Sequence, residues 1–283
     1  MEKIKVTKMQ GCGNDFVIVD YAEYEKTNLE MADFAKKVCD RNFGIGADGL
    51  IIPKTDVDDA DVSWYFYNSD GSTAQMCGNG MRCFAKYVKD NKIVEKNEIA
   101  VKTLAGIIKP QIQENGLVRV NMGQPILFPE KIPCKLTKAT NQKLILGGKF
   151  YSVNVVSMGN PHCVIFVDDE DDILDLAKKL GPQFETHEVF PEKTNVEFVK
   201  IKSRNEIDMC VWERGCGITL ACGTGACASV VISILNNLTD SNVKVNLLGG
   251  ALNVEWQGST ANMRDDVFLT GPAEYSFFAE YLL

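Results

Sequence analysis

Met76-Cys77-Gly78-Asn79-Gly80 and Ala221-Cys222-Gly223-Thr224-Gly225 are two versions of one motif, a cysteine followed by Gly-x-Gly. Each version leads into a run of apolar and small residues that reads as a helix, and the two cysteines are 145 positions apart. A cysteine at the start of a helix, present twice, indicates two thiol sites built in the same way.

The repeat extends beyond the cysteines. Gly13-Asn14 and Gly159-Asn160 each precede a strand-like run, and their asparagines are 146 positions apart. Gly123 and Gly271, each closely followed by a proline, are 148 positions apart. This offset is too long for a solenoid repeat, so we expect one domain that has been duplicated within the chain.

The secondary structure expected from the sequence is rich in strands. Helices are expected over Asn28–Asp40 and over Ile173–Leu180, where Gly181-Pro182 should end the second one. The two helices after the cysteine motifs are apolar on several faces, which is typical of buried helices. We therefore expect an α+β (α/β) fold of two pseudo-symmetric domains, each a curved, mostly antiparallel or mixed sheet around a central buried helix. The expected domains are residues 1–123, joined by 271–283, and residues 124–270.

Composition excludes several classes of function. The chain has 283 residues, of which 45% are hydrophobic and 24% charged, as in ordinary globular proteins. Its net charge of -8 disfavours nucleic-acid binding and attachment to anionic membranes. No apolar run is long enough for a signal peptide or a membrane span, so we expect a cytoplasmic protein whose ten cysteines are reduced.

The two cysteines have a chemical interpretation. A helix N-terminus can lower the pKa of a thiol from about 8.5 into a range of roughly 3.5 to 7.5, and Gly-x-Gly exposes backbone N–H groups to an anion. Two such thiols on opposite faces of one carbon could invert it, one as base and one as acid, while the helix N-termini stabilise a carboxylate. This requires that Cys77 and Cys222 reach the same ligand.

Three alternatives to this interpretation remain at this point. Either cysteine could be a small buried residue with no chemical role. A zinc site is disfavoured because the sequence contains no Cys-x-x-Cys, and the same absence disfavours a dedicated redox dithiol. Gly44-Ile45-Gly46-Ala47-Asp48-Gly49 matches a dinucleotide-binding fingerprint in letters, but a strand follows it where a helix is required, so we interpret it as a loop.

The chain resembles the diaminopimelate epimerase family, which consists of cofactor-independent amino-acid isomerases. The resemblance implies two pseudo-symmetric α/β domains with the site between them, a small amino-acid substrate, no cofactor, no metal and a homodimer. It also implies epimerisation of LL-diaminopimelate to meso-diaminopimelate, for the synthesis of lysine and peptidoglycan precursors. The matching segments cover the chain in order: Gly11–Phe16, Asn68–Ser72, Met76–Cys83, Gly159–His162, Asn195–Phe198, Glu213–Gly215, Ala221–Ala226 and Thr270–Ala273.

By this resemblance Cys77 and Cys222 are the acid and base. Glu213 would pair with an ammonium group of the substrate and Arg214 with its distal carboxylate. His162, expected in a turn, would tune the thiol pKa values together with Glu213. The remaining substrate-binding residues implied by the resemblance are Gly78, Asn79, Gly223 and Thr224 at the α-carboxylate, with Asn14, Asn68, Asn160 and Asn195 as further hydrogen-bonding groups.

Some positions depart from the family pattern. Gly49 stands where some members carry a substrate-binding glutamine, Ile218 stands where a glutamate is usual, and Cys216 replaces a small apolar residue. We expect Cys83, Cys216 and Cys227 to be packing residues. The rival functions are a proline or hydroxyproline racemase-type isomerase of the same fold and a non-catalytic amino-acid-binding protein.

Overall fold

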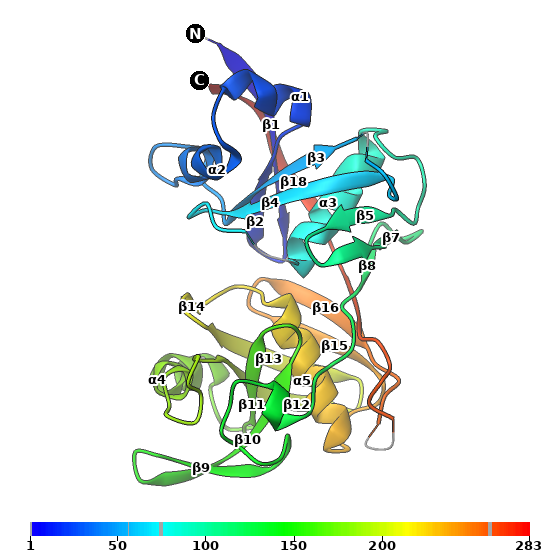
Figure 1. Cartoon of the computed structure of the whole chain (residues 1–283). Helices are drawn as coiled ribbons and strands as arrows, with labels where there is room; N and C mark the ends of the chain where they lie inside the picture. The colour runs from blue at the N-terminus through cyan, green and yellow to red at the C-terminus, as the bar shows by residue number, and fades with distance from the viewer. Residues whose placement is uncertain (1, 56, 74–75, 260–261) are drawn as a thin grey trace. The chain divides into compact units, whose positions relative to one another are not determined.

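The computed structural model describes residues 2–55, 57–73, 76–259 and 262–283 and divides the chain into two compact units (Figure 1). Unit 1 comprises Met1–Val120 and Gly271–Leu283, and unit 2 comprises Asn121–Thr270. The chain therefore passes from unit 1 to unit 2 three residues before the expected boundary at residue 123, and it returns after Thr270. Both units combine a mixed sheet with few helices, which confirms the predicted fold class.

Unit 1 is built on a sheet with the strand order β18-β1-β2-β3-β4-β5-β6. The C-terminal strand β18 pairs antiparallel with β1, with Lys3 opposite Leu282, so the last residues of the chain complete this unit. Its elements are β1 (Lys3–Gly11), β2 (Asn14–Ile18), α1 (Tyr21–Tyr24), η1 (Glu25–Thr27), α2 (Met31–Cys39), β3 (Gly49–Lys54), β4 (Val62–Asn68), α3 (Gly78–Asp90), β5 (Val101–Thr103), β6 (Gly106–Ile108), β7 (Gln111–Ile112), β8 (Val118–Asn121) and β18 (Glu274–Leu282).

Helix α3 is the buried helix of unit 1 and packs against β1, β2 and β3. Met81, Phe84 and Val88 are fully buried on it, as the helical spacing of apolar residues predicted. The ring of Trp64 meets Phe84 edge-on at 5.8 Å between centroids. Burying each large apolar side chain contributes roughly 1.5 to 3 kcal/mol, so this core fixes the position of the helix and of the residue at its start.

Unit 2 is built on a sheet with the strand order β17-β16-β15-β13-β12-β11-β10-β9, and β14 pairs with β13. Helix α5 packs against β10, β11, β12 and β16, and ten of its residues are buried, as predicted for a central helix. The elements are η2 (Pro129–Lys131), β9 (Gln142–Leu146), β10 (Lys149–Ser157), β11 (Pro161–Phe166), α4 (Ile173–Glu185), β12 (Asn195–Ser203), β13 (Glu206–Glu213), β14 (Gly217–Ile218), α5 (Gly223–Leu235), β15 (Asn242–Leu247), β16 (Gly250–Glu255) and β17 (Phe268–Gly271).

The two sheets repeat one pairing pattern, as a duplicated domain predicts. In unit 1 the pairs from β1 to β6 are antiparallel, parallel, antiparallel, parallel and antiparallel. In unit 2 the pairs β10-β11, β11-β12, β12-β13, β13-β15 and β15-β16 follow the same sequence of directions. The helices α3 and α5 are both 13 residues long, and each begins after a cysteine and is followed by an asparagine, Asn91 or Asn236.

Helix α4 differs from its prediction, because it continues through Gly181-Pro182 to Glu185. An internal proline costs roughly 3 kcal/mol. The additional turn compensates by burying Phe184 completely, with its ring edge-on to Tyr151 at 5.3 Å. Gly181 fits because a Cβ there would lie 2.6 Å from the side chain of Trp212. Packing in the core therefore overrides the local stop signal.

Three further expectations need correction, and one is confirmed. Helix α2 begins at Met31 and not at Asn28, whose φ of 51° places it in the left-handed region outside the helix. His162 lies in strand β11 and not in a turn. Cys216 is exposed in the turn after β13, so it is not a packing residue. The loop at Gly44 leads into strand β3, as expected, and not into a helix.

Candidate active site

Cys77 caps the N-terminus of α3 with its sulfur. Its backbone is extended, with φ -138° and ψ 108°, and Sγ accepts a hydrogen bond from the backbone N–H of Gly80 at 3.4 Å. Serine and threonine oxygens commonly cap helices in this way, and here a sulfur takes that place. Cys77 is half-buried, and Gly78 and Asn79 behind it form the first turn of the helix. The thiol therefore lies at the positive end of the helix dipole, beside the backbone N–H groups of the first turn.

Asn14, at the start of β2, presents an oxygen to this thiol. Its Oδ1 lies 3.9 Å from Sγ of Cys77 and accepts a hydrogen bond from Nδ2 of Asn79 at 3.1 Å. Its Nδ2 donates to Oδ2 of Asp48 at 2.6 Å. Because a carboxylate can only accept hydrogen bonds, Asp48 fixes which end of the Asn14 amide faces the cysteine.

A charged network supports Asp48. Arg41 donates to Asp15 at 2.9 Å and to Asp48 at 2.8 Å, and Lys8 forms an ion pair with Asp15 at 2.7 Å. Burial would raise the pKa of Asp15, but the hydrogen bonds from Arg41 and Lys8 outweigh it and lower the pKa to about 2. The carboxylate is therefore charged throughout the neutral range and holds this end of the sheet together.

Asn68 ends strand β4, opposite Gly49 in the register with β3. Its Nδ2 donates to Oγ of Ser72 at 2.9 Å. A Cβ at Gly49 would lie 2.8 Å from the carbonyl oxygen of Tyr67, so a larger residue requires a shift of the strand here. The register thus places Asn68 beside the segment that carries Asp48, at the same end of the sheet as Asn14.

Cys222 repeats the geometry of Cys77 in unit 2. It caps α5 with φ -124° and ψ 110°, and Sγ accepts a hydrogen bond from the N–H of Gly225 at 3.3 Å. Gly223 begins the helix, and Oγ1 of Thr224 lies 3.5 Å from Sγ. Unlike Cys77, this cysteine is buried. The thiols predicted from sequence therefore both lie at helix starts, in equivalent places of the two units.

The pKa of Cys222 is raised well above its ordinary value. Burial is the main cause, and the neighbouring carboxylates of Glu213 and Glu197 add to it, whereas Thr224 and the N–H of Gly225 oppose it. Burial also raises the pKa of Glu213, which ends β13 and accepts a short hydrogen bond from Thr219. The carboxylate of Glu213 thus contributes to the raised pKa of Cys222, and the helix start does not lower this pKa as expected from the sequence.

His162 and Glu197 form a fully buried pair on β11 and β12. Nδ1 of His162 lies 2.6 Å from Oε1 of Glu197, and neither side chain is exposed to solvent. Nε2 of His162 faces Oδ1 of Asn160 at 3.0 Å, and Nδ2 of Asn160 donates to Oγ1 of Thr224 at 3.3 Å. Burial raises the pKa of Glu197, while His162 opposes this shift. The histidine therefore reaches Cys222 through Asn160 and Thr224.

Asn195 and Arg214 complete the predicted residues of unit 2. Asn195 begins β12, donates from Nδ2 to the carbonyl of Pro161 at 2.9 Å, and accepts from the backbone N–H of Arg214 at 2.9 Å. Asn195 therefore fixes the turn that carries Arg214, whose side chain is exposed and donates to the carbonyl of Glu192 at 3.2 Å.

Sequence reasoning missed Glu197, Thr219 and Asp48 as site residues. The signal for Glu197 was its place among the apolar residues Val196, Phe198 and Val199 at the buried end of the strand, where a charged side chain requires a buried partner. Thr219 and Asp48 carried no signal, because polar residues in turns are ordinary.

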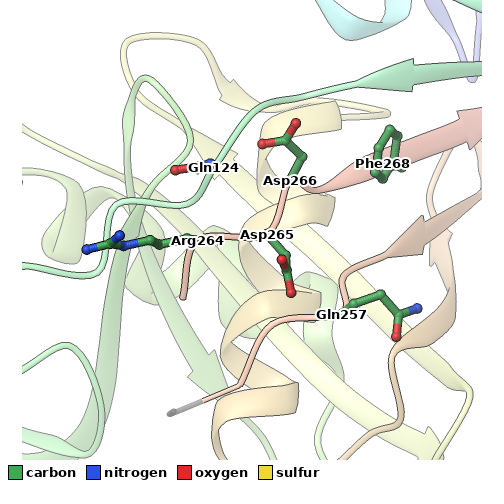
Figure 2. Close-up of a pocket in the computed structure, with 6 residues that line it drawn as sticks. All are labelled: Gln124, Gln257, Arg264, Asp265, Asp266 and Phe268. Atoms are coloured by element: carbon green, nitrogen blue, oxygen red, sulfur yellow. The ribbon is translucent and has the colours of Figure 1, made fainter. Parts of the chain in front are cut away.

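The hollow drawn in Figure 2 contains none of the predicted site residues. It lies in unit 2 and is lined by Gln124, Gln257, Arg264, Asp265, Asp266 and Phe268. Within the described ranges, no three His, Cys, Asp or Glu side chains are grouped as metal ligands are. In the same part of the chain, no helix has the length and apolar character needed to cross a membrane.

Sequence comparison relates the chain to one family. The profile described as Diaminopimelate epimerase matches residues 6–128 and 154–276. The chain is 47% identical to a diaminopimelate epimerase of Halothermothrix orenii over 96% of this chain and 95% of that one. It is 49% identical to that of Carboxydothermus hydrogenoformans over 98% of each, and 44% identical to a chloroplastic diaminopimelate epimerase of Oryza sativa subsp. japonica over 96% of this chain and 78% of that one.

Solved structures share the fold at low sequence identity. A phenazine biosynthesis protein of the PhzF family from Bacillus anthracis matches with a TM-score of 0.71 and 16% identity over 100% of both chains. A probable proline racemase from Agrobacterium radiobacter K84 matches with a TM-score of 0.68 and 14% identity, covering 98% of this chain and 92% of that one. These likenesses concern the fold alone.

Proposed function

Because the chain belongs to the diaminopimelate epimerase family, we propose that it converts LL-diaminopimelate to meso-diaminopimelate with Cys77 and Cys222 as its acid and base. The chain is an isomerase, and the resemblance seen in its sequence is confirmed. The observation that carries the proposed mechanism is the placement of both thiols as N-terminal caps of equivalent buried helices. The reaction belongs to lysine biosynthesis and supplies peptidoglycan precursors.

The proposed chemistry needs one base and one acid on opposite faces of the α-carbon. In one direction a thiolate removes the α-proton while the other thiol delivers a proton to the opposite face, and the two exchange roles in reverse. We assign Cys222 as the thiol of the resting pair, because burial and neighbouring carboxylates favour its protonated form, and Cys77 as the base. Since the chain itself supplies both groups, the proposed mechanism uses no pyridoxal phosphate.

The α-carboxylate is the anion that the helix starts are suited to bind. Negative charge moves from the α-carbon into this carboxylate during proton removal, and backbone N–H groups at a helix start stabilise it there. Gly78 with Asn79 and Gly223 with Thr224 supply these groups, because they form the first turns of α3 and α5. The N–H groups at the two helix starts would together stabilise the negative charge as it develops on the α-carboxylate.

The second amino-acid end of the substrate would be held without reacting. The exposed guanidinium of Arg214 offers two parallel donors to a carboxylate. Glu213 would pair with an ammonium group, and this pairing would lower its raised pKa. We propose Asn14, Asn68, Asn160 and Asn195 as the further substrate-binding side chains, each at the end of a sheet strand or beside one.

We propose that two copies of this chain associate in the cytoplasm. Strand β18 is the edge of the unit 1 sheet and carries exposed aromatic residues, with Phe278 71% exposed and Phe277 44% exposed. An apolar sheet edge is typical of a surface covered by a partner. Phe278→Lys should therefore yield a monomer in sedimentation velocity, and an unchanged dimer would contradict this surface.

The proposed function is tested by measuring turnover of LL-diaminopimelate by the parent and by Cys77→Ala and Cys222→Ala. Both variants should lose epimerisation while retaining the circular dichroism spectrum of the parent. Cys216→Ala is the matched control, because it removes an exposed thiol that the mechanism does not use. Near-normal turnover by either site variant would refute the two-base assignment. Turnover of proline without turnover of diaminopimelate would favour the racemase alternative.

A further inference from the structure

A chain of hydrogen bonds in unit 2 joins a buried carboxylate to the sulfur of Cys222. It runs from Glu197 to His162 at 2.6 Å, from His162 to Asn160 at 3.0 Å, from Asn160 to Thr224 at 3.3 Å, and from Thr224 to Cys222 at 3.5 Å. All five residues belong to one unit. This series of hydrogen bonds begins at Glu197, to which the mechanism above gives no direct role.

The direction of each hydrogen bond follows from the groups at its two ends. Nδ1 of His162 faces a carboxylate and Nε2 faces an amide oxygen, so each ring nitrogen has an acceptor in front of it. The Nδ2 of Asn160 then donates to Thr224, whose hydroxyl hydrogen is left to point at Sγ of Cys222. From Nε2 of His162 onward, every link therefore donates toward the sulfur.

Glu197 determines this direction because its burial leaves it few partners. Its side chain is fully buried, and Oε2 has no hydrogen-bond partner among the described residues. A buried carboxyl group needs a hydrogen-bond partner, and Oε1 has Nδ1 of His162, so the two groups share a proton between them. The other titratable groups facing Glu197 are Cys222 on α5, Cys163 on β11 and Glu213 on β13, none of which is a cation.

We propose that Glu197 is a positioning residue that holds Nδ1 of His162 so that Nε2 donates to Asn160, and that it thereby fixes the amide of Asn160 and aims the Thr224 hydroxyl at Cys222. This inference deepens the proposed function and rests on it where Cys222 is taken as catalytic. When Cys222 gives its proton to the substrate, the hydroxyl of Thr224 donates to the resulting thiolate. The same carboxylate also limits the space at the helix start, since a Cβ on Gly225 would lie 2.9 Å from Oε1.

Glu197→Gln should reverse the direction of these hydrogen bonds while keeping nearly the same side-chain size. An amide oxygen in the place of Oε1 accepts from Nδ1 and brings no proton of its own, so the ring keeps its single proton on Nδ1 and Nε2 becomes an acceptor. The amide of Asn160 then turns over, and the hydroxyl of Thr224 donates to Asn160 and no longer to Cys222. Glu197→Asp keeps a carboxyl group, so it should restore part of the Cys222 alkylation rate and of the kcat of the parent.

The first test uses the fact that the chain has only two histidines. Nitrogen-15 NMR of histidine-labelled protein reports the protonation of each ring nitrogen, and His187→Gln assigns the two rings. In the parent, His162 should carry a proton on Nε2, because this nitrogen faces the amide oxygen of Asn160. In Glu197→Gln it should carry its proton on Nδ1. A His162 ring without a proton on Nε2 in the parent overturns the proposal, and this part of the measurement needs neither a variant at Glu197 nor turnover.

The second test measures how fast iodoacetamide alkylates Cys222 as pH varies, with each thiol followed by mass spectrometry. Losing one hydrogen bond to a charged group raises the pKa by about one unit, so alkylation at neutral pH should fall about tenfold in Glu197→Gln. Cys77 in the same sample is the internal reference and should be unchanged.

Kinetics then separate positioning from a general loss of stability. Glu197→Gln should lower kcat more than it raises KM and shift the pH profile of kcat, with partial rescue in Glu197→Asp. Ser233→Ala is the matched control, because it removes a buried hydrogen bond near the other end of α5. An unchanged Cys222 alkylation profile in folded Glu197→Gln overturns the proposal. Absence of diaminopimelate turnover in the parent would instead contradict the proposed function, whatever the histidine spectrum shows.

Discussion

Gly225 and Gly80 occupy equivalent places, the third residues of α5 and α3, yet their replacement by alanine should have opposite effects on stability. A Cβ on Gly225 would lie 2.9 Å from Oε1 of Glu197 and 3.2 Å from Sγ of Cys222. A Cβ on Gly80 would meet its nearest neighbour, the ring of Phe16, at 3.4 Å, which is an ordinary contact. The local sequence motif is the same, so the difference comes only from what packs against each helix.

The magnitudes follow from two opposing contributions. Alanine is favoured over glycine in a helix by roughly 0.5 to 1 kcal/mol, and Gly80→Ala should gain most of this in the free energy of unfolding. Overpacking a filled core costs about 1 to 3 kcal/mol, so at Gly225 it should outweigh the same gain. Gly225→Ala should therefore lower the free energy of unfolding by about 1 kcal/mol.

Urea unfolding followed by circular dichroism measures both variants against the parent. The midpoint should rise for Gly80→Ala and fall for Gly225→Ala, at an unchanged dependence on urea. If both variants are stabilised equally, the Glu197 carboxylate and the Cys222 sulfur do not crowd the start of α5, and the reasoning about this half of the site fails.

Two further predictions concern charged groups. The pKa of Asp15 is about 2 in the folded protein, below its unfolded value of about 3.9. The charged carboxylate therefore contributes about 2 to 3 kcal/mol to the free energy of unfolding above pH 4, and this contribution is lost as pH falls toward 2. Asp15→Asn should remove this part of the acid dependence in urea titrations at pH 5 and pH 3, and an unchanged dependence would contradict it. Arg214→Lys keeps the charge but loses the planar fork, so the KM for diaminopimelate should rise about tenfold with kcat less affected. An unchanged KM would remove Arg214 from the substrate site.

The duplication and the two thiols could be predicted because their signals are local. Each Cys-Gly-x-Gly is followed directly by a run typical of a buried helix, and both Cys77 and Cys222 cap helices in the structure. The nearly equal offsets between the halves predicted one fold repeated, and the repeated order of strand directions agrees with it. Such features depend on neighbours in sequence or on comparison of one half with the other.

Features that depend on strand register could not be predicted in this way. The parallel pairing of β11 with β12 sets His162 opposite Asn195 and brings Glu197 within hydrogen-bonding distance of the ring, across 35 positions of sequence. No residue near His162 in the sequence indicates that partner. The local pattern Asn160-Pro161-His162 predicts a turn, whereas the strand pairing places His162 in β11. In the same way, the burial of Phe184 extends α4 past Pro182, where the local signal alone ends the helix.

The two-base assignment is tested most directly by the early time course of LL-diaminopimelate turnover in D₂O. If two different thiols remove and deliver the proton, the meso product should carry solvent deuterium at one α-carbon from the first turnovers, while recovered LL-diaminopimelate stays unlabelled. Cys77→Ala and Cys222→Ala should each form no labelled product. Recovered substrate that gains deuterium as fast as the product, or product that contains none, would contradict the assignment of Cys77 and Cys222 as opposed base and acid.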